Sequence, residues 1–225
     1  MLRRLRPTPR RIAVLVAATI GVGAGVAYAA SLSVGSWHLW AGSQTLTKST
    51  CTLTGTTQTI DTYVSSSSSG SNFGSNTTML VQPNTSNKEW AFVEFDPSSC
   101  SIPTTGGADT ATLKLTITGT PNASRTLTVT PVLTSWSESG LTWTSAQSLS
   151  YGSTTTQFAT GTTTNATLSI PVTIDVDALI KNPSASYGWR ISDGGSQATG
   201  DTSTFASSEN ATSSRRPQLV INYEK

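Results

Sequence analysis

The sequence contains little charge, a single histidine and no long helical apolar pattern, and each shortage excludes a class of protein. Charged residues make up 12 % of the 225 residues, whereas a disordered acidic or basic tail requires a high net charge. A coiled coil would take roughly half of its residues from Ala, Glu, Lys, Leu and Arg, which this composition does not provide. No window of a dozen residues repeats its apolar positions every 3.6 residues. The shortages therefore exclude a domain built from long amphipathic helices.

Serine and threonine are abundant instead, since 34 Ser and 40 Thr make up a third of the chain. Apolar and polar residues alternate through 113–117, 168–176 and 219–223, which is the pattern of a strand with one buried face. Pro131 lies within a similar run and indicates an edge strand or a bulge, and one helical turn is expected over 175–181. Many short strands separated by turn residues predict an all-β sandwich or barrel.

The N-terminus has the pattern of an export signal. Five arginines within residues 1–11 precede an uncharged run over 12–30, which includes the small-x-small cleavage site Ala27-Tyr28-Ala29. We therefore expect a signal peptide over 1–29, an N-terminal extension over 30–55 and a β-sandwich domain over 56–225 that is secreted and extracellular. The alternative is a membrane anchor formed by an uncleaved signal, because about 17–25 apolar residues can span a bilayer.

The charge of the mature chain argues against two kinds of partner. Without residues 1–29, nine basic and twelve acidic residues remain, which gives a balance of 9 − 12 = −3. Nucleic acids and anionic membranes bind basic surfaces. We therefore expect no nucleic acid and, after signal cleavage, no membrane as a partner.

Both cysteines, Cys51 and Cys100, follow the expected signal. Two cysteines in an oxidising compartment most simply form one disulfide, so the sequence predicts a Cys51–Cys100 bond. The alternative, a zinc site, would need four ligands with characteristic spacing, and His38 is the one histidine of the sequence.

Metal and catalytic sites are not predicted. Asp61, Asp193 and Asp201 are oxygen ligands of the type that calcium accepts, but no spacing matches a calcium-loop signature, so we expect no metal or other cofactor. Glu94 and Asp96 share a strand face about 6.5–7 Å apart, which is compatible with a glycosidase pair. Asp96 precedes a proline, however, and is expected to cap a turn. A serine nucleophile would need a base, which the single histidine, in the extension, does not supply.

Short blocks of sequence resemble a known family. In chain order they are Asp61-Thr62-Tyr63-Val64, Asn72-Phe73-Gly74-Ser75, Phe92-Val93-Glu94-Phe95-Asp96 before Ile102-Pro103, Ala111-Thr112-Leu113-Lys114-Leu115, Trp136-Ser137-Glu138 with Thr142-Trp143, Ile174-Asp175-Val176, Tyr187-Gly188-Trp189-Arg190, Phe205-Ala206-Ser207-Ser208-Glu209 and Arg216-Pro217-Gln218-Leu219-Val220. Over residues 55–225 they resemble a DNRLRE domain, also classed as carbohydrate-binding module family 96. Ser208 is a departure, because an Arg usually precedes the Glu at this place in the family.

The resemblance implies a jelly-roll-type antiparallel β-sandwich, secretion and polysaccharide binding, with acidic glycans such as alginate among the ligands of the family. We therefore predict a secreted, non-catalytic carbohydrate-binding module for a cell-wall or acidic polysaccharide. The alternative is a structural or adhesive cell-surface domain. An exposed, near-coplanar tryptophan pair over a groove with an arginine nearby would favour the first. A convex, Ser/Thr-coated surface with all four tryptophans of the domain buried would favour the second.

Aromatic and guanidinium side chains are the candidate binding residues. Aromatic rings bury the apolar CH faces of sugars, and guanidinium groups pair with uronate carboxylates. On this basis we predict carbohydrate contacts from Trp189, Arg190, Trp90 and Arg125. The alternative is core packing for the tryptophans, and a solvated face or a structural ion pair for the arginines. Because neighbours on a strand point to opposite faces, at most one of Trp189 and Arg190 can face a flat groove.

The remaining marked residues are expected to be structural. Trp136 and Trp143 are expected to pack in the core. Glu209 is expected to make a buried hydrogen bond rather than a contact to a ligand.

Overall fold

The structure is a computed structural model that describes residues 31–34, 37–40, 46–83, 87–104, 106–195 and 201–225. The chain divides into two compact units, residues 1–45 and 46–225. In the first unit, β1 (Ser31–Val34) and β2 (Trp37–Trp40) form an antiparallel hairpin. The expected signal peptide lies outside the described residues.

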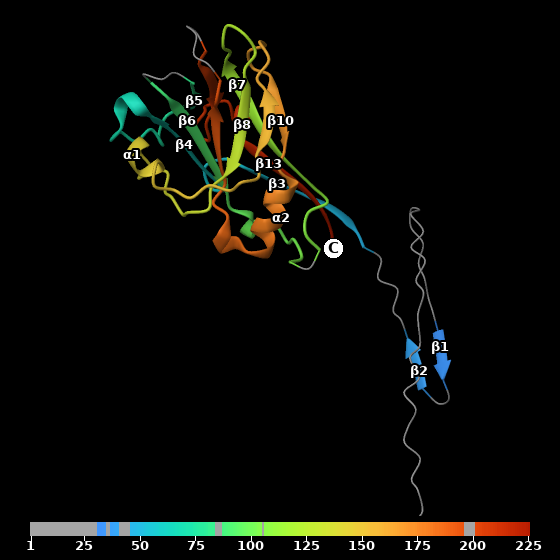
Figure 1. The fold of residues 1–225 in the computed structure, drawn as a ribbon. Helices are drawn as coiled ribbons and strands as arrows, with labels where there is room; N and C mark the ends of the chain where they lie inside the picture. Colours follow the sequence, from blue (N-terminus) through green and yellow to red (C-terminus); the bar gives the residue numbers. More distant parts are fainter. Residues whose placement is uncertain (1–30, 35–36, 41–45, 84–86, 105, 196–200) are drawn as a thin grey trace, which may run out of the picture. The chain divides into compact units, whose positions relative to one another are not determined.

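Residues 46–225 form two antiparallel sheets that pack face to face (Figure 1). The strands of the six-stranded sheet are β3 (Lys48–Thr54), β5 (Thr78–Val81), β7 (Thr110–Gly119), β10 (Thr167–Pro171), β12 (Ser203–Ala206) and β13 (Gln218–Glu224). The strands of the five-stranded sheet are β4 (Thr59–Ser65), β6 (Glu89–Phe95), β8 (Thr126–Pro131), β9 (Thr156–Ala159) and β11 (Trp189–Asp193). The all-β sandwich predicted from the sequence is confirmed.

The order of the strands defines which strands lie at the edges of each sheet. The six-stranded sheet runs β3-β13-β7-β12-β5, with β10 also paired to β7, and the five-stranded sheet runs β4-β6-β11-β8-β9. The helices are short: α1 (Trp143–Ala146), α2 (Thr173–Lys181) and the 3-10 turns η1 (Ser66–Ser68), η2 (Pro97–Ser99), η3 (Pro183–Ala185) and η4 (Ser213–Arg215). Figure 1 shows α2 at one end of the sandwich and α1 on the side of β4.

The alternating runs account for the core between the sheets. Leu113, Leu115 and Ile117 of β7 are fully buried, and β13 places Leu219 directly opposite Leu113. Ile221 and Tyr223 follow on the same buried face of β13. Burial of each large apolar side chain stabilises the fold by about 1.5–3 kcal/mol, so the two predicted strand faces supply much of the core.

The predicted strand over 168–176 is only half right, because it ends at Pro171 and α2 begins at Thr173. The Val172 amide still donates to the Ala111 carbonyl of β7 at 2.9 Å, and the chain turns into α2 directly after this bond. From there a helical face points inward, with Val176, Leu179 and Ile180 buried, while Ile174 is 72 % exposed. The helix is also longer than the single turn expected.

The interpretation of Pro131 as an edge or bulge residue is wrong. Strand β8 lies between β11 and β9, and Pro131 is its last residue. The pairing with β9 covers only Thr126 to Val129, so no hydrogen bond of that ladder requires a proline amide.

The predicted disulfide between Cys51 and Cys100 is confirmed, with a Cα–Cα distance of 5.9 Å. Cys51 lies on β3, an edge strand whose partner is β13, and Cys100 follows η2. Strand β3 belongs to the sandwich, although the sequence placed its residues in the extension. The bond therefore ties an edge strand to the connection between β6 and β7.

Candidate functional site

A second apolar cluster lies on the outer face of the five-stranded sheet. Phe92 belongs to it, whereas its neighbours on β6, Ala91 and Val93, point into the core between the sheets. Residues 133–152, which we call the covering segment, supply Leu141 and Ala146 to this cluster. The two ends of the segment meet at the sheet, where Val132 pairs with Tyr151. The Leu133 amide also donates a hydrogen bond of 2.8 Å to the Ser150 carbonyl. The covering segment therefore shields part of a sheet face that would otherwise be open.

Three tryptophans border this cluster, and all three are half-buried. The ring centroids of Trp90 and Trp143 lie 4.4 Å apart with a tilt of 41°. Trp136 meets Phe92 edge-on at 5.9 Å, and its indole N–H donates to the Tyr187 carbonyl at 2.9 Å. Trp136 and Trp143 thus hold the covering segment on the sheet, while part of each ring still meets solvent.

Arg190 lies among these rings. Its guanidinium carbon is 4.6 Å from the centroid of Trp90 and 4.1 Å from that of Tyr151. Stacking of this kind fixes a guanidinium flat between two aromatic faces. Its Nε is buried without a hydrogen-bond partner among the described residues. The Tyr151 hydroxyl donates to the Ala146 carbonyl at 2.7 Å, so the covering segment positions one of the two rings.

Trp189 points the other way. It is 2 % exposed, packs near Phe95 in the core, and donates its indole N–H to Asp175 of α2 at 2.7 Å. An indole in this position cannot contact a polysaccharide while the domain is folded. Of the two neighbours on β11, Arg190 is the one that faces outward.

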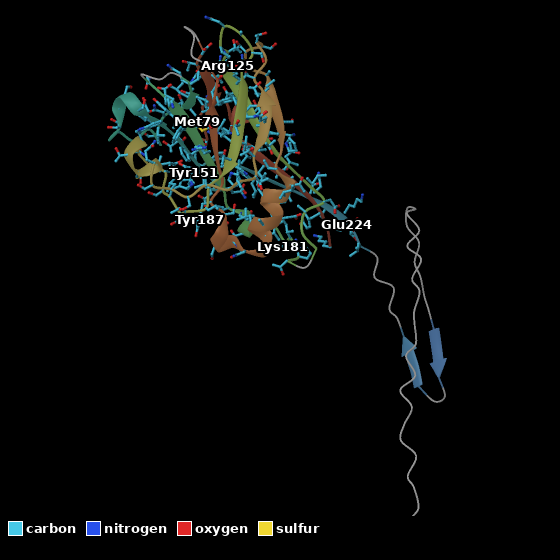
Figure 2. The ribbon with its side chains drawn as sticks, viewed as in Figure 1. Met79, Arg125, Tyr151, Lys181, Tyr187 and Glu224 are labelled. Carbon is cyan, nitrogen blue, oxygen red and sulfur yellow. A yellow bond between two sulfur atoms is a disulfide. The ribbon has the colours of Figure 1, made fainter. Side chains whose placement is uncertain are left out.

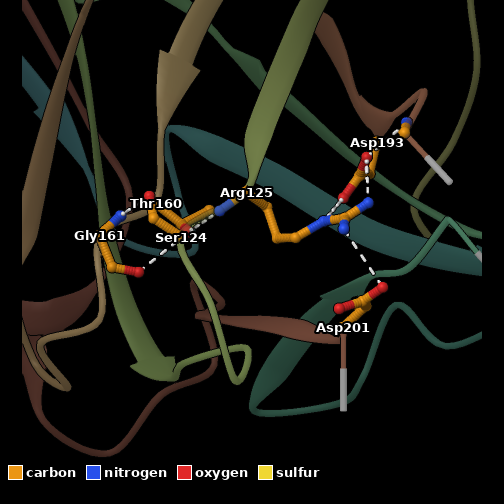
Figure 3. Close-up of polar contacts among 7 residues, drawn as sticks. Ser124, Arg125, Thr160, Gly161, Asp193 and Asp201 are labelled. Atoms are coloured by element: carbon orange, nitrogen blue, oxygen red, sulfur yellow. Dashed lines mark hydrogen bonds and ion pairs between the residues drawn. The ribbon is translucent and has the colours of Figure 1, made fainter. Parts of the chain in front are cut away.

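Arg125 is held by two carboxylates (Figure 3). Its Nε and Nη2 contact Asp193 at 2.7 and 3.1 Å, and its Nη1 contacts Asp201 at 3.2 Å. The side chain of Asp193 is almost fully buried. This is the structural ion pair that the sequence left open as an alternative. Figure 2 shows Arg125 at the end of the sandwich opposite Tyr187. Arg125 directly precedes β8, whereas Arg190 pairs with Thr130 near the other end of that strand, so the two arginines do not form one site.

The carboxyl groups of Glu94 and Asp96 do not act as a pair. Asp96 accepts a hydrogen bond from the Ser98 amide at 2.8 Å and caps η2. Burial raises the pKa of Glu94 to about 7, and the charge of Asp96 adds to the rise. Glu94 Oε2 is buried without a hydrogen-bond partner among the described residues.

The structure brings together three other carboxyl groups, which we call the acidic cluster: Asp61, Glu138 and Glu209. One oxygen from each lies within 4.8 Å of the others. Glu138 accepts from the Asp61 amide at 2.9 Å, and the Ser208 amide donates to Asp61 Oδ2 at 2.8 Å. Ser208 also donates its hydroxyl to Glu209 at 2.8 Å. The sequence marked Asp61 as one oxygen ligand of the calcium type but did not group it with Glu138.

Burial dominates the electrostatics of this cluster. It raises the pKa of Asp61 to about 8; the Ser208 amide opposes the rise, and the charges of Glu209 and Glu138 add to it. Burial also raises the pKa of Glu138. Carboxylates that share a site resist full ionisation unless a cation joins them. Each of the three lies in a sequence block that carries the family resemblance, and this was the one signal that could have pointed to them.

In the described part of the chain, no helix is long and apolar enough to cross a membrane. No curated protein matches the chain. The family model for carbohydrate-binding module family 96 matches residues 52–223, which is most of the chain and nearly all of the sandwich with its covering segment. The chain therefore belongs to carbohydrate-binding module family 96.

Proposed function

We propose that this domain is a secreted, non-catalytic module that binds an acidic polysaccharide through the outer face of its five-stranded sheet. Arg190 supplies the positive charge, and Trp90 and Tyr151 supply apolar ring surface beside it. Trp189 and Arg125 have no part in this site, since one is buried and the other is held by Asp193 and Asp201.

The observation that carries the proposal is the stacked guanidinium of Arg190. Two rings hold it in place, at 4.6 and 4.1 Å, so little side-chain entropy is lost when it pairs with an anion. A guanidinium forms two parallel hydrogen bonds with a carboxylate, which a neutral sugar cannot accept in the same way. The arrangement therefore favours a polymer of uronic acids over a neutral glycan.

The carboxyl groups do not support glycoside hydrolysis. Asp96 caps a turn, and Glu94 is half-buried beside it. The acidic cluster is packed too closely, with oxygens within 4.8 Å, and a glycosidase pair lies about 5–9.5 Å apart across the scissile bond. Asp61 is also 1 % exposed, so a sugar cannot reach it.

Tryptophan exposure favours glycan binding over the structural or adhesive alternative. The rings of Trp90 and Trp143 are tilted by 41° and so are not the near-coplanar pair expected for a glycan site, but the burial of all four tryptophans expected for the alternative is not observed either. Only Trp189 is buried, and Trp90, Trp136 and Trp143 remain partly open to solvent on the face that carries Arg190.

Isothermal titration of the full chain with alginate, a polyuronate, and with a neutral glycan of similar length tests the proposal. We expect binding of alginate and weaker or no binding of the neutral glycan. Arg190→Gln should weaken alginate binding about ten- to hundredfold, because a hydrogen bond to a charged group contributes about 1.5–3 kcal/mol. Incubation with either glycan should release no shorter oligosaccharides.

Lys181→Gln is the matched control, because it removes one positive charge from an exposed position on α2. It should bind alginate as the unaltered chain does. Equal affinities for Arg190→Gln and Lys181→Gln, with both variants folded by circular dichroism, would refute the site. If neither glycan binds the unaltered chain, the adhesive alternative takes its place.

A further inference from the structure

We propose that Asp61, Glu138 and Glu209 bind a calcium ion that joins both sheets to the covering segment. Asp61 comes from β4 at the edge of the five-stranded sheet, and Glu209 follows β12 of the six-stranded sheet. Glu138 comes from the covering segment. An ion at this place would therefore connect three parts of the domain that are far apart in sequence.

The spacing of the oxygens fits calcium. Calcium binds oxygens at 2.3–2.6 Å, so two oxygens on opposite sides of the ion are about 5 Å apart. One oxygen from each of the three carboxyl groups lies within 4.8 Å of the others. Magnesium demands a near-ideal octahedron at about 2.0–2.1 Å and gives up its waters reluctantly, so a site formed by three carboxyl groups from separate segments suits calcium better.

Two oxygens of the cluster are buried without a partner among the described residues, which is the independent sign of a ligand. They are Oδ1 of Asp61 and Oε2 of Glu209. Asp61 is 1 % exposed, and its other oxygen already accepts from the Ser208 amide. Buried carboxylate oxygens in native proteins are paired with donors or with a metal. A cation between them would satisfy both at once.

No positively charged side chain of the described residues forms an ion pair with the cluster. The contrast is the pair Asp193 and Asp201 at the other end of the sandwich, where Arg125 bridges the two carboxylates. Both places bring aspartates together from separate segments. Only one of them has a guanidinium, so at the acidic cluster a cation from solution would take the corresponding place.

Two residues of the cluster, Glu138 and Glu209, also line a pocket, whereas Asp61 lies buried behind them. The pocket has a volume of about 330 Å³, and its lining residues are Asn72, Gly74, Ser75, Glu138, Ser139 and Glu209. Calcium takes six to eight oxygens, so waters in this pocket would complete the set that the three carboxylates begin. The pocket would bring an ion as far as Glu138 and Glu209.

Titration of calcium chloride into the full chain, after removal of metals with EDTA, tests the proposal without any glycan. We expect a measurable heat of binding with a stoichiometry near one ion per chain. At a calcium concentration about a hundred times the Kd, Tm should rise by about 5–10 °C over the value in EDTA. Magnesium at the same concentration should give a smaller rise.

Glu138→Gln removes one charge and keeps the oxygen that accepts from the Asp61 amide. This variant should lose the calcium response, while its Tm in EDTA stays the same or increases, because one member of a like-charged group has been neutralised. Glu209→Gln is a second variant with the same expectation, should the first fail to fold. Glu224→Gln on β13 is the matched control and should respond to calcium as the unaltered chain does.

A full calcium response in both Glu138→Gln and Glu209→Gln would overturn the site. The absence of heat and of any Tm shift in the unaltered chain would overturn the proposal altogether. Alginate binding can fail in either case without affecting this result, because the experiment contains no glycan.

Discussion

Removal of the Cys51–Cys100 bond should cost the domain a large part of its stability. The bond closes a loop with a sequence separation of 49 residues. In the chain-entropy treatment, a loop of this length restricts the unfolded chain by about 4 kcal/mol. Single domains are stable by about 5–15 kcal/mol in total. The double variant Cys51→Ala/Cys100→Ala should therefore still fold, with much of its margin removed.

The structure also indicates where the weakened domain opens first. Strand β3 is at the edge of the six-stranded sheet and is held by β13 alone among the named strands. Without the bond, nothing covalent ties the middle of β3 to the rest of the sandwich. Amide hydrogen exchange should accelerate more in β3 than in β7, which is paired on both sides.

Thermal unfolding followed by circular dichroism measures the main effect. For a domain of this size, 4 kcal/mol corresponds to a fall in Tm of about 8–16 °C. Dithiothreitol should lower the Tm of the unaltered chain to a similar value and should leave the double variant unchanged. A loss below about 1 kcal/mol in the double variant, or a response of that variant to reductant, would refute the reasoning.

Two further changes test the packing and the electrostatics of β6. Gly188→Ala should destabilise the domain by about 3 kcal/mol or more, because Gly188 has a φ of +73° and an added Cβ would meet the Val93 carbonyl and lie 2.6 Å from Glu94 Cα. Gly194→Ala, where a Cβ meets nothing within 4 Å, should change the free energy of unfolding by less than about 0.5 kcal/mol in urea titrations, and equal losses would contradict the clash. Burial raises the pKa of Glu94 from 4.5 to about 7. The stability that the protonated Glu94 side chain contributes is therefore fully present below about pH 4.5 and is lost as the pH rises through 7. Glu94→Gln should remove this dependence on pH and stabilise the domain at pH 8 by about 1–2 kcal/mol, after allowance for solvent around a half-buried group. If the free energy of unfolding of this variant still changes with pH between 4.5 and 8 as that of the unaltered chain does, the assignment to Glu94 is contradicted.

The strands were predictable where one face is buried along their whole length. The runs 113–117 and 219–223 show this, because every second residue points into the same core. The run 168–176 misled because Val172 and Val176, four residues apart, also share a helix face. Both periods place these two residues on the same side, so alternation alone could not locate the end of the strand at Pro171.

The sites were less predictable than the strands, because they depend on contacts between distant segments. Trp90, Trp189 and Arg190 were all candidates. The sequence could not show that Trp90 would be the tryptophan stacked on Arg190 and that Trp189 would be buried in the core. Tyr151 was missed, since nothing in its neighbourhood distinguishes it from a surface residue. Asp61 and Glu138 are 77 positions apart, and the sandwich alone brings them together.

The covering segment separates the outer surface of this domain from the scaffold that supports it. The core between the sheets consists of residues from the strands and α2, and the outer apolar cluster has a different membership. Substitutions at Trp136, Trp143 or Tyr151 would therefore alter the shape of the exposed face and leave the facing sheets intact. The exposed face can therefore be altered at these three positions while the sandwich keeps its core.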